Sequence, residues 1–308
     1  MGNKLSSFLL IIVAFIWGTA FVAQTSGMKS MGPFTFTAFR LLIGGIVILP
    51  FSFFYLRKNN HFEFKSIILI IFMSLALLIG ALFQQVALLY TNVANVAFLT
   101  ALYVPIVPLI YFLYLKKPVS KSIIVAAFLC ILGVWLLSEN DLEFGNYGDI
   151  LSIIGAFFWS LHIILISKST QMKLEPVVTA ALHIFFAGLL CLVLAFSLEK
   201  PNYIDISLGA FELIYTGVFS IGLGFTLQTI AQKNSPPTNV AIILSLESVF
   251  ASIAALILLG QYLNTKSILG CSLILFGVIL SEYYRDRKFI WGLIRNVKFF
   301  KRNKDYST

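Results

Sequence analysis

Ten long apolar runs, separated by short polar segments, fill this chain of 308 residues. Each run has about the length of roughly 17–25 residues that a helix needs to cross a bilayer. The pattern therefore predicts an all-α integral membrane protein with ten transmembrane helices. The expected spans are residues 5–23, 34–56, 66–89, 93–115, 122–138, 149–167, 177–198, 211–231, 240–260 and 267–284.

The composition excludes most other classes of protein. Hydrophobic residues make up 59% of the chain and charged residues only 11%, whereas a soluble domain carries roughly 25% charged residues. The three cysteines all fall in apolar runs without the spacing of a zinc site. No Walker motif is present, so we do not expect ATP to drive the protein directly. We also expect no bound cofactor.

The basic residues predict the orientation. If the N-terminus is cytoplasmic, the inner segments carry 18 Lys and Arg residues and the outer segments carry 3. Cytoplasmic loops of membrane proteins are enriched in these residues. We therefore expect both termini in the cytoplasm, and we interpret the net charge of +9 as this bias rather than as a nucleic-acid surface.

The two halves of the chain resemble each other. Trp17 and Trp159 occupy similar motifs at an offset of 142, and Gln84 and Gln228 occupy similar positions at an offset of 144. The sequence thus predicts a repeat of five spans. The expected units are residues 1–140, residues 145–284 and a basic cytoplasmic tail of residues 285–308.

An odd number of spans in each half has a topological consequence. Two similar halves of five spans cross the membrane in opposite directions, which makes them inverted repeats. Secondary transporters are built in this way, with a binding site between the halves near the middle of the membrane. The repeat therefore favours a transporter that works by alternating access.

Short motifs in this order resemble the EamA family of the drug/metabolite transporter superfamily. The resemblance covers residues 5–284 and rests on residues 16–19, 39–42, 246–251 and 259–263, together with Pro105. It implies ten spans, a site on spans 1–4 and 6–9, and export of amino acids or other metabolites. The chain departs from the family pattern at Ser248, where a proline is usual, and at Gln261, where a glutamate is usual.

Ionisable groups inside spans are costly and are therefore candidates for function. Glu247, the one acid deep in a span, could bind a proton or could be paired permanently with a neighbouring polar group. Arg40 could bind a carboxylate of a substrate, pair with Glu247, or extend toward the outer interface. His162 and His183 are interpreted as core groups rather than as proton relays.

The candidate substrate-binding residues combine these groups with polar and aromatic side chains at matched positions. They are Trp17, Arg40, Gln84, Asn95, Tyr103, Trp159, His183, Gln228, Asn239 and Glu247.

We expect a plasma-membrane exporter of a small organic solute, such as an amino acid, a metabolite or a drug-like compound. Its partners would be that solute and the lipid bilayer, without nucleic acid, and the sequence leaves open whether two copies form a homodimer. A passive channel is the main alternative. A membrane-embedded enzyme is disfavoured, because one deep acid and three histidines do not assemble a recognisable catalytic site.

Overall fold

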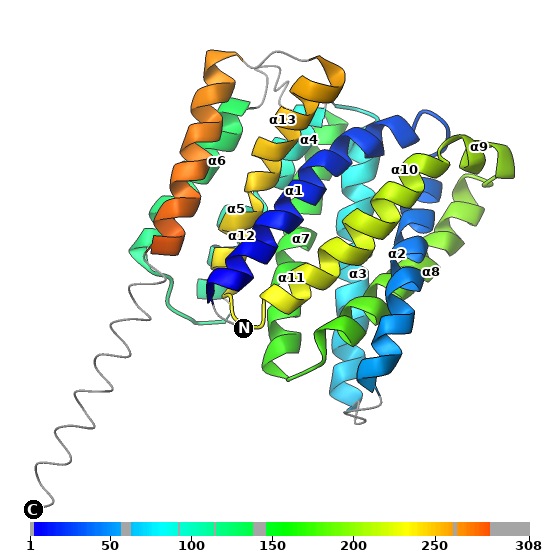
Figure 1. Cartoon of the computed structure of the whole chain (residues 1–308), viewed down its shortest axis with the longest axis horizontal. Coiled ribbons are helices and arrows are strands. Elements are labelled where there is room, and N and C mark those ends of the chain that lie inside the picture. Colours follow the sequence, from blue (N-terminus) through cyan, green and yellow to red (C-terminus); the bar gives the residue numbers. More distant parts are fainter. Residues whose placement is uncertain are drawn as a thin grey trace, which may run out of the picture.

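The computed structural model describes residues 3–56, 63–91, 93–113, 115–137, 146–260 and 264–283, and the predicted tail and Gln261 lie outside these ranges. Within them all regular structure is helical (Figure 1). In chain order the helices are α1 (Asn3–Gly27), α2 (Pro33–Leu56), α3 (Phe64–Ala87), α4 (Val93–Thr100), α5 (Tyr103–Leu113), α6 (Lys121–Leu137), α7 (Tyr147–Gln171), α8 (Pro176–Leu198), α9 (Tyr203–Leu208), α10 (Ala210–Tyr215), the π-helix η1 (Thr216–Gly224), α11 (Phe225–Ala231), α12 (Pro237–Leu244), α13 (Leu246–Leu259) and a last helix (Thr265–Tyr283).

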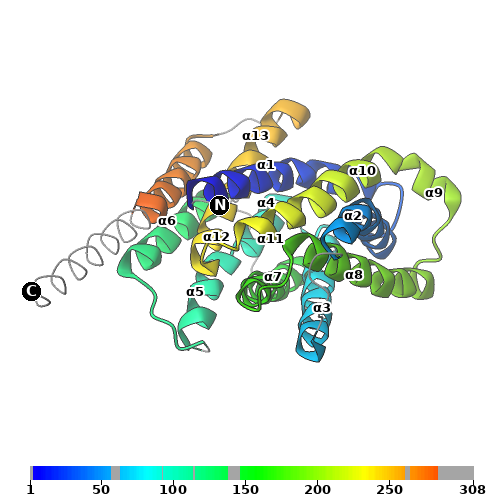
Figure 2. The ribbon, with the colours of Figure 1, turned by 60° about the horizontal axis from the view of Figure 1, so that its bottom comes forward.

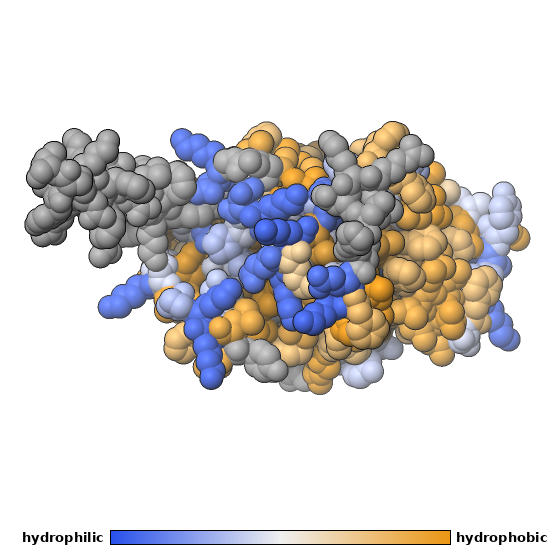
Figure 3. Space-filling view, turned by 90° about the horizontal axis from the view of Figure 1, so that it is seen from below, coloured by the Kyte–Doolittle hydropathy of each residue, from blue (hydrophilic) through white to orange (hydrophobic). Residues whose placement is uncertain are grey.

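Most of the predicted spans correspond to long apolar helices. Over the described residues, nine helical segments are long and apolar enough to cross a membrane. The predicted fifth span falls on α6, which has 17 residues and lies at the short end of the usual range. Exposed apolar side chains cover the flanks of the molecule, as a lipid-facing surface requires (Figure 3).

Two of the spans are broken near their middle, at corresponding positions in the two halves. In the first half the break between α4 and α5 begins at Ala101, four residues before Pro105. Proline lacks an N–H and clashes with the carbonyl of the residue four positions earlier, which explains this break. In the second half α12 and α13 meet at Ser245, whose hydroxyl donates to the Ile242 carbonyl at 2.6 Å. Back-bonding of this kind bends helices.

The helices pack as pairs that combine the two halves. Helix α2 lies along α8, α3 lies along α7, and α1 crosses near α13 and the α10–η1–α11 segment (Figures 1 and 2). The N-terminus and the α7–α8 and α11–α12 turns lie at one end of the molecule (Figure 1). The α1–α2 and α8–α9 connections lie at the other end. Helices from both halves therefore surround the centre of the bundle.

Contacts between the halves are reciprocal. A methyl group at Gly45 would come within 2.9 Å of Phe185, and one at Gly188 would come within 2.9 Å of Leu42. Gly45 and Gly188 are repeat partners at an offset of 143, and Leu42 and Phe185 are repeat partners at the same offset. Each glycine therefore contacts the repeat partner of the residue that the other glycine contacts. Two surfaces related by a two-fold axis make contacts of this kind. The close approach also explains why small residues stand at these positions.

Candidate functional site

A central cavity lies between the two halves. It leaves about 50 Å³ to the centres of water molecules, against the roughly 10–15 Å³ that one water requires. Among the described residues, none of those that line it comes from α6 or the last helix. The lining residues are Trp17, Phe21, Gln24, Arg40, Gln84, Thr100, Tyr103, Trp159, His162, Ile163, Ser220, Ile221, Phe225, Gln228, Leu244 and Glu247.

The two tryptophans form matched walls of this cavity. Trp17 packs against Gly224 of the second half, and Trp159 packs against Gly80 of the first half. Between them lies Phe225, with ring centroids 4.9 Å from Trp17 and 5.9 Å from Trp159. The indole of Trp17 also donates to the Ser220 carbonyl at 2.9 Å. The matched pair predicted from the sequence therefore meets around one shared ring.

The π-helix η1 makes part of this wall. It spans nine residues, whereas π-helices are usually single-turn insertions in α-helices and occur frequently at functional sites. Ser220 and Ile221 of this segment line the cavity. The backbone carbonyl of Ser220 in this segment accepts a hydrogen bond from the Trp17 indole.

Arg40 is buried at the cavity wall with a neutral partner. Its side chain is 3% exposed, and one terminal nitrogen donates to Gln24 Oε1 at 2.6 Å. The guanidinium carbon lies 5.6 Å from the centroid of the Phe36 ring. The ion pair with Glu247 that the sequence allowed is not formed, since the ion pair found among the described residues is Lys233–Glu175 at 3.7 Å.

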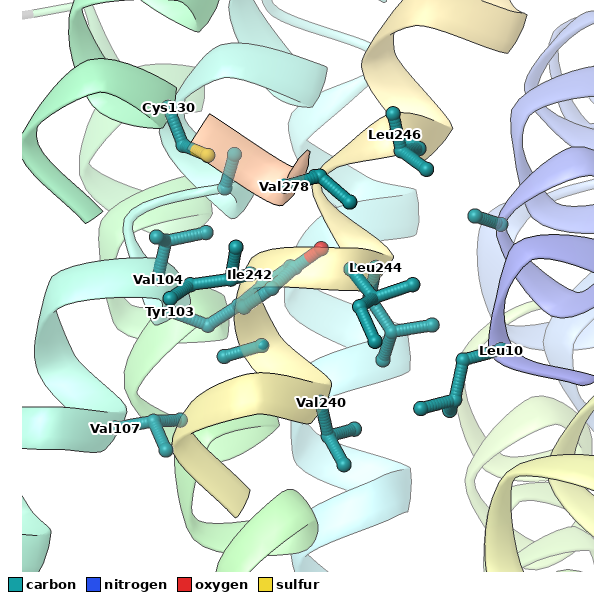
Figure 4. Close-up of a cluster of buried hydrophobic side chains, with 14 of the residues drawn as sticks. Leu10, Tyr103, Val104, Val107, Cys130, Val240, Ile242, Leu244, Leu246 and Val278 are labelled. Atoms are coloured by element: carbon teal, nitrogen blue, oxygen red, sulfur yellow. The ribbon is translucent and has the colours of Figure 1, made fainter. Parts of the chain in front are cut away.

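Glu247 is hydrogen-bonded to its own repeat partner. The Tyr103 hydroxyl donates to Glu247 Oε1 at 2.8 Å, and the two residues are 144 positions apart in the chain. Each lies two residues beyond the corresponding break, at Ala101 or Ser245. Figure 4 shows the Tyr103 hydroxyl directed toward the chain at the junction of α12 and α13. A contact between matched residues places both of them at the boundary where the two halves meet.

Other polar groups in the wall have hydrogen-bonding capacity left for a ligand. Gln84 donates to the Thr100 hydroxyl at 3.3 Å, which joins α3 to α4. Among the described residues, buried polar atoms without a hydrogen-bond partner include Gln228 Oε1, Trp159 Nε1 and both ring nitrogens of His162. Buried polar atoms normally have partners in proteins or in ordered water. These atoms can therefore bond a solute or water in the cavity.

Two of the predicted residues lie away from the cavity, and the side chain of a third is not described. His183 is fully buried behind the wall, with Nδ1 2.6 Å from the Thr179 carbonyl and its ring 5.1 Å from that of His162. Asn239 lies at the start of α12, where its side chain donates to Ser281 at 2.9 Å, next to a separate crevice. Asn95 belongs to α4, and its side chain lies outside the described part.

Sequence reasoning missed several residues of the cavity. Gln24 gave no clear signal, because it lies only three residues before the end of α1 at Gly27, and its bond to Arg40 is visible only in the structure. His162 was identified as an ionisable group but was left out of the candidate set. Phe225 gave no signal, since it is one of 30 phenylalanines in the chain.

The described part of the chain shows no metal centre. Within the described ranges, no cluster of three His, Cys, Asp or Glu side chains has the arrangement of a metal site. Arg40 and Glu247 are the charged side chains among the residues that line the cavity, and hydrogen-bonding side chains and aromatic rings make up much of the remainder. Such a lining suits a small organic solute with both polar and apolar parts.

Comparison with known proteins identifies the family. The model of the EamA-like transporter family matches twice, over residues 4–139 and 146–283. An uncharacterized transporter of Archaeoglobus fulgidus is 30% identical over 272 residues, which cover 88% of this chain and 83% of that protein. The uncharacterized transporter YwfM of Bacillus subtilis is 26% identical, over 91% of this chain and 94% of its own length.

A solved crystal structure shares the fold. It superposes with a TM-score of 0.77 at 16% sequence identity, over 93% of this chain and 99% of that one. The family match extends over nearly all of the predicted spans, and the relatives carry the name of transporters. The chain therefore belongs to the EamA-like transporter family and is a multi-pass membrane transporter.

Proposed function

We propose that the protein is a secondary transporter with two inverted five-span repeats, residues 1–140 and 145–284, which alternately open a central site to the two sides of the membrane. The reciprocal contacts of Gly45 and Gly188 support a two-fold relation between the halves. Matched breaks at Ala101 and Ser245 support it as well. Transporters with inverted repeats bind their substrate at such broken helices near the middle of the membrane.

The observation that carries the proposal is the composition of the cavity wall. Both repeats contribute to it, through Trp17 and Gln84 from the first and Trp159 and Gln228 from the second. If one repeat rocks against the other, a solute held by both experiences a change of access without leaving its binding groups. A solute with an apolar part and several hydrogen-bonding groups fits this wall.

The proposed direction is export across the plasma membrane, with both termini in the cytoplasm. The 18-to-3 distribution of basic residues supports this orientation. Hydrophilic side chains gather on the face that carries the N-terminus (Figure 3), as expected for the cytoplasmic side. Export itself follows the general tendency of the family that the sequence resembles.

Counterflow in liposomes tests the proposal. The purified full chain is reconstituted with an unlabelled metabolite panel inside, and entry of labelled solute is followed. An alternating-access carrier accelerates entry of label when the same solute is present in excess on the opposite side. Flux that rises linearly with concentration, without such acceleration, would instead indicate a channel.

A pair of variants connects this flux to the cavity. Trp159→Ala removes a cavity wall, whereas Phe157→Ala alters the same helix at a side chain that is 45% exposed and absent from the cavity lining. In the first variant we expect a higher solute concentration to be needed for half-maximal counterflow. The second variant should resemble the unmodified protein. Equal behaviour of the two variants would place the solute elsewhere.

A further inference from the structure

In the part of the chain that the structure describes, the buried guanidinium of Arg40 has neither an opposite charge beside it nor enough hydrogen bonds to replace the water it has lost. Its side chain is 3% exposed, and among the described residues its one hydrogen bond goes to the neutral amide of Gln24. Its Nε is buried without a partner. A guanidinium offers five N–H donors in a fixed plane, so most of this hydrogen-bonding capacity is unused.

The acids near this end of the bundle are engaged elsewhere. Glu199 accepts from the backbone N–H groups of Phe34 and Thr35 at the start of α2, at 3.0 and 2.7 Å. Glu212 accepts from Ser26 at 3.0 Å. Glu247 accepts from Tyr103, and among the described residues no carboxylate forms an ion pair with Arg40.

A charge taken out of water is strongly disfavoured unless an opposite charge accompanies it. An anion bound in the cavity could supply the opposite charge, because both Arg40 and Gln24 line this cavity. A carboxylate carries one negative charge, matches one unpaired cation, and accepts two parallel N–H bonds from a guanidinium edge. The side chain is therefore prepared for an anion that the protein does not itself supply.

We propose that Arg40 is the binding group for a carboxylate on the transported solute, so that the substrates are small organic acids, with or without an amine. This inference rests on the proposed transport function. Gln24 positions the guanidinium from one side, and the Phe36 ring lies against it. The aromatic wall formed by Trp17, Trp159 and Phe225 receives the apolar remainder of the solute.

The first test uses pairs of probes that differ only at the acid. They are 4-methylpentanoate with 4-methylpentanamide, leucine with leucinamide, and benzoate with benzamide. Binding to the purified full chain in detergent is measured by quenching of tryptophan fluorescence and by the shift of the unfolding temperature. We expect at least a tenfold preference for the acid in one or more pairs. An absence of any acid preference across the three pairs overturns the proposal.

Variants then assign the preference to one side chain. Arg40→Gln should abolish the acid preference, chiefly by weakening binding of the acid. Gln24→Glu places a carboxylate where the amide oxygen already lies 2.6 Å from the guanidinium, so it should exclude the solute's acid and raise the unfolding temperature. Because Gln24→Glu keeps the cation in place, it provides a test even if Arg40→Gln does not fold.

The control removes a positive charge without touching the cavity. Lys29 is exposed in the α1–α2 turn, near the end of the bundle where Arg40 lies. Lys29→Gln should keep the acid preference within twofold. If Lys29→Gln loses the preference as fully as Arg40→Gln does, long-range attraction explains the result and the binding site proposed at Arg40 is overturned.

Counterflow separates this inference from the function on which it rests. Counterflow of amides or amines alone would support the transport function but overturn the carboxylate site at Arg40. Acid binding that depends on Arg40, without counterflow of any solute, would support the carboxylate site but overturn the transport mechanism. Counterflow of acids that is lost in Gln24→Glu and kept in Lys29→Gln supports both.

Discussion

Substitution of Gly224 by alanine should destabilise the protein, although alanine is the better helix former. A Cβ atom at Gly224 would lie 2.6 Å from Trp17 Nε1, well inside contact distance. The indole must then move away, which breaks its 2.9 Å hydrogen bond to the Ser220 carbonyl. The same movement disturbs the packing of Trp17 against Phe225, whose ring centroid lies 4.9 Å from that of the indole.

The magnitude follows from three contributions. Overpacking costs about 1–3 kcal/mol, and loss of a hydrogen bond costs about 0.5–1.5 kcal/mol. Replacing glycine by alanine in a helix returns about 1 kcal/mol. The net loss of unfolding free energy should therefore be roughly 0.5–3.5 kcal/mol. Equilibrium unfolding in mixed micelles, followed by far-ultraviolet circular dichroism, measures it without relying on tryptophan fluorescence.

Two further variants make the prediction specific. Gly155→Ala is the matched control, because the nearest atom to its added methyl group would be the Gly80 carbonyl oxygen at an ordinary 3.5 Å. We expect it to be neutral or slightly stabilising. Trp17→Phe removes the nitrogen that the new methyl group meets, so Gly224→Ala should cost less in that background. Additive effects of the two substitutions, or a stable Gly224→Ala protein, would refute the contact as the cause.

Three other predictions concern transport and topology. Glu247→Gln should abolish proton-driven accumulation while solute exchange continues, and unchanged pH-dependent uptake at normal expression would make Glu247 a structural residue. Gln84→Ala and Gln228→Ala should each weaken solute affinity by roughly 1–3 kcal/mol in a binding titration, and normal affinity in both would remove these side chains from the site. In a cysteine-free variant, an impermeant maleimide should label Lys117→Cys from the cytoplasm and Asp141→Cys from outside, and labelling of the latter from the cytoplasm alone would contradict the span assignment.

The sequence predicted the helical architecture because its main signals are local. A run of apolar residues long enough to cross a bilayer must satisfy its backbone hydrogen bonds internally, so it forms a helix whatever its neighbours are. Those runs predicted the spans, and short motifs in fixed order predicted the family, which the family model confirms. The matched pair of Trp17 and Trp159 could be predicted in the same way, because similar motifs recur in the sequence at an offset of 142.

The direction of each side chain was much less accessible. In a soluble helix the apolar stripe faces the core, but in a membrane both lipid and core are apolar, so the pattern does not mark the inward face. Phe225, at the centre of the cavity wall, therefore looked like any lipid-facing phenylalanine. Asn239 lies near the start of α12 and donates to Ser281 of the last helix, a contact that its position in the chain did not reveal.

The sequence by itself determined that the chain is helical and membrane-spanning, the order of its apolar segments and the charge asymmetry, because each depends on residues close together in the chain or on their counts. The tertiary structure decided which groups meet. It joined Tyr103 to Glu247 across 144 residues and left Arg40 with Gln24 rather than with an acid. Such partnerships depend on how the helices rotate and cross, and rotation and crossing follow from side-chain packing between elements far apart in the sequence.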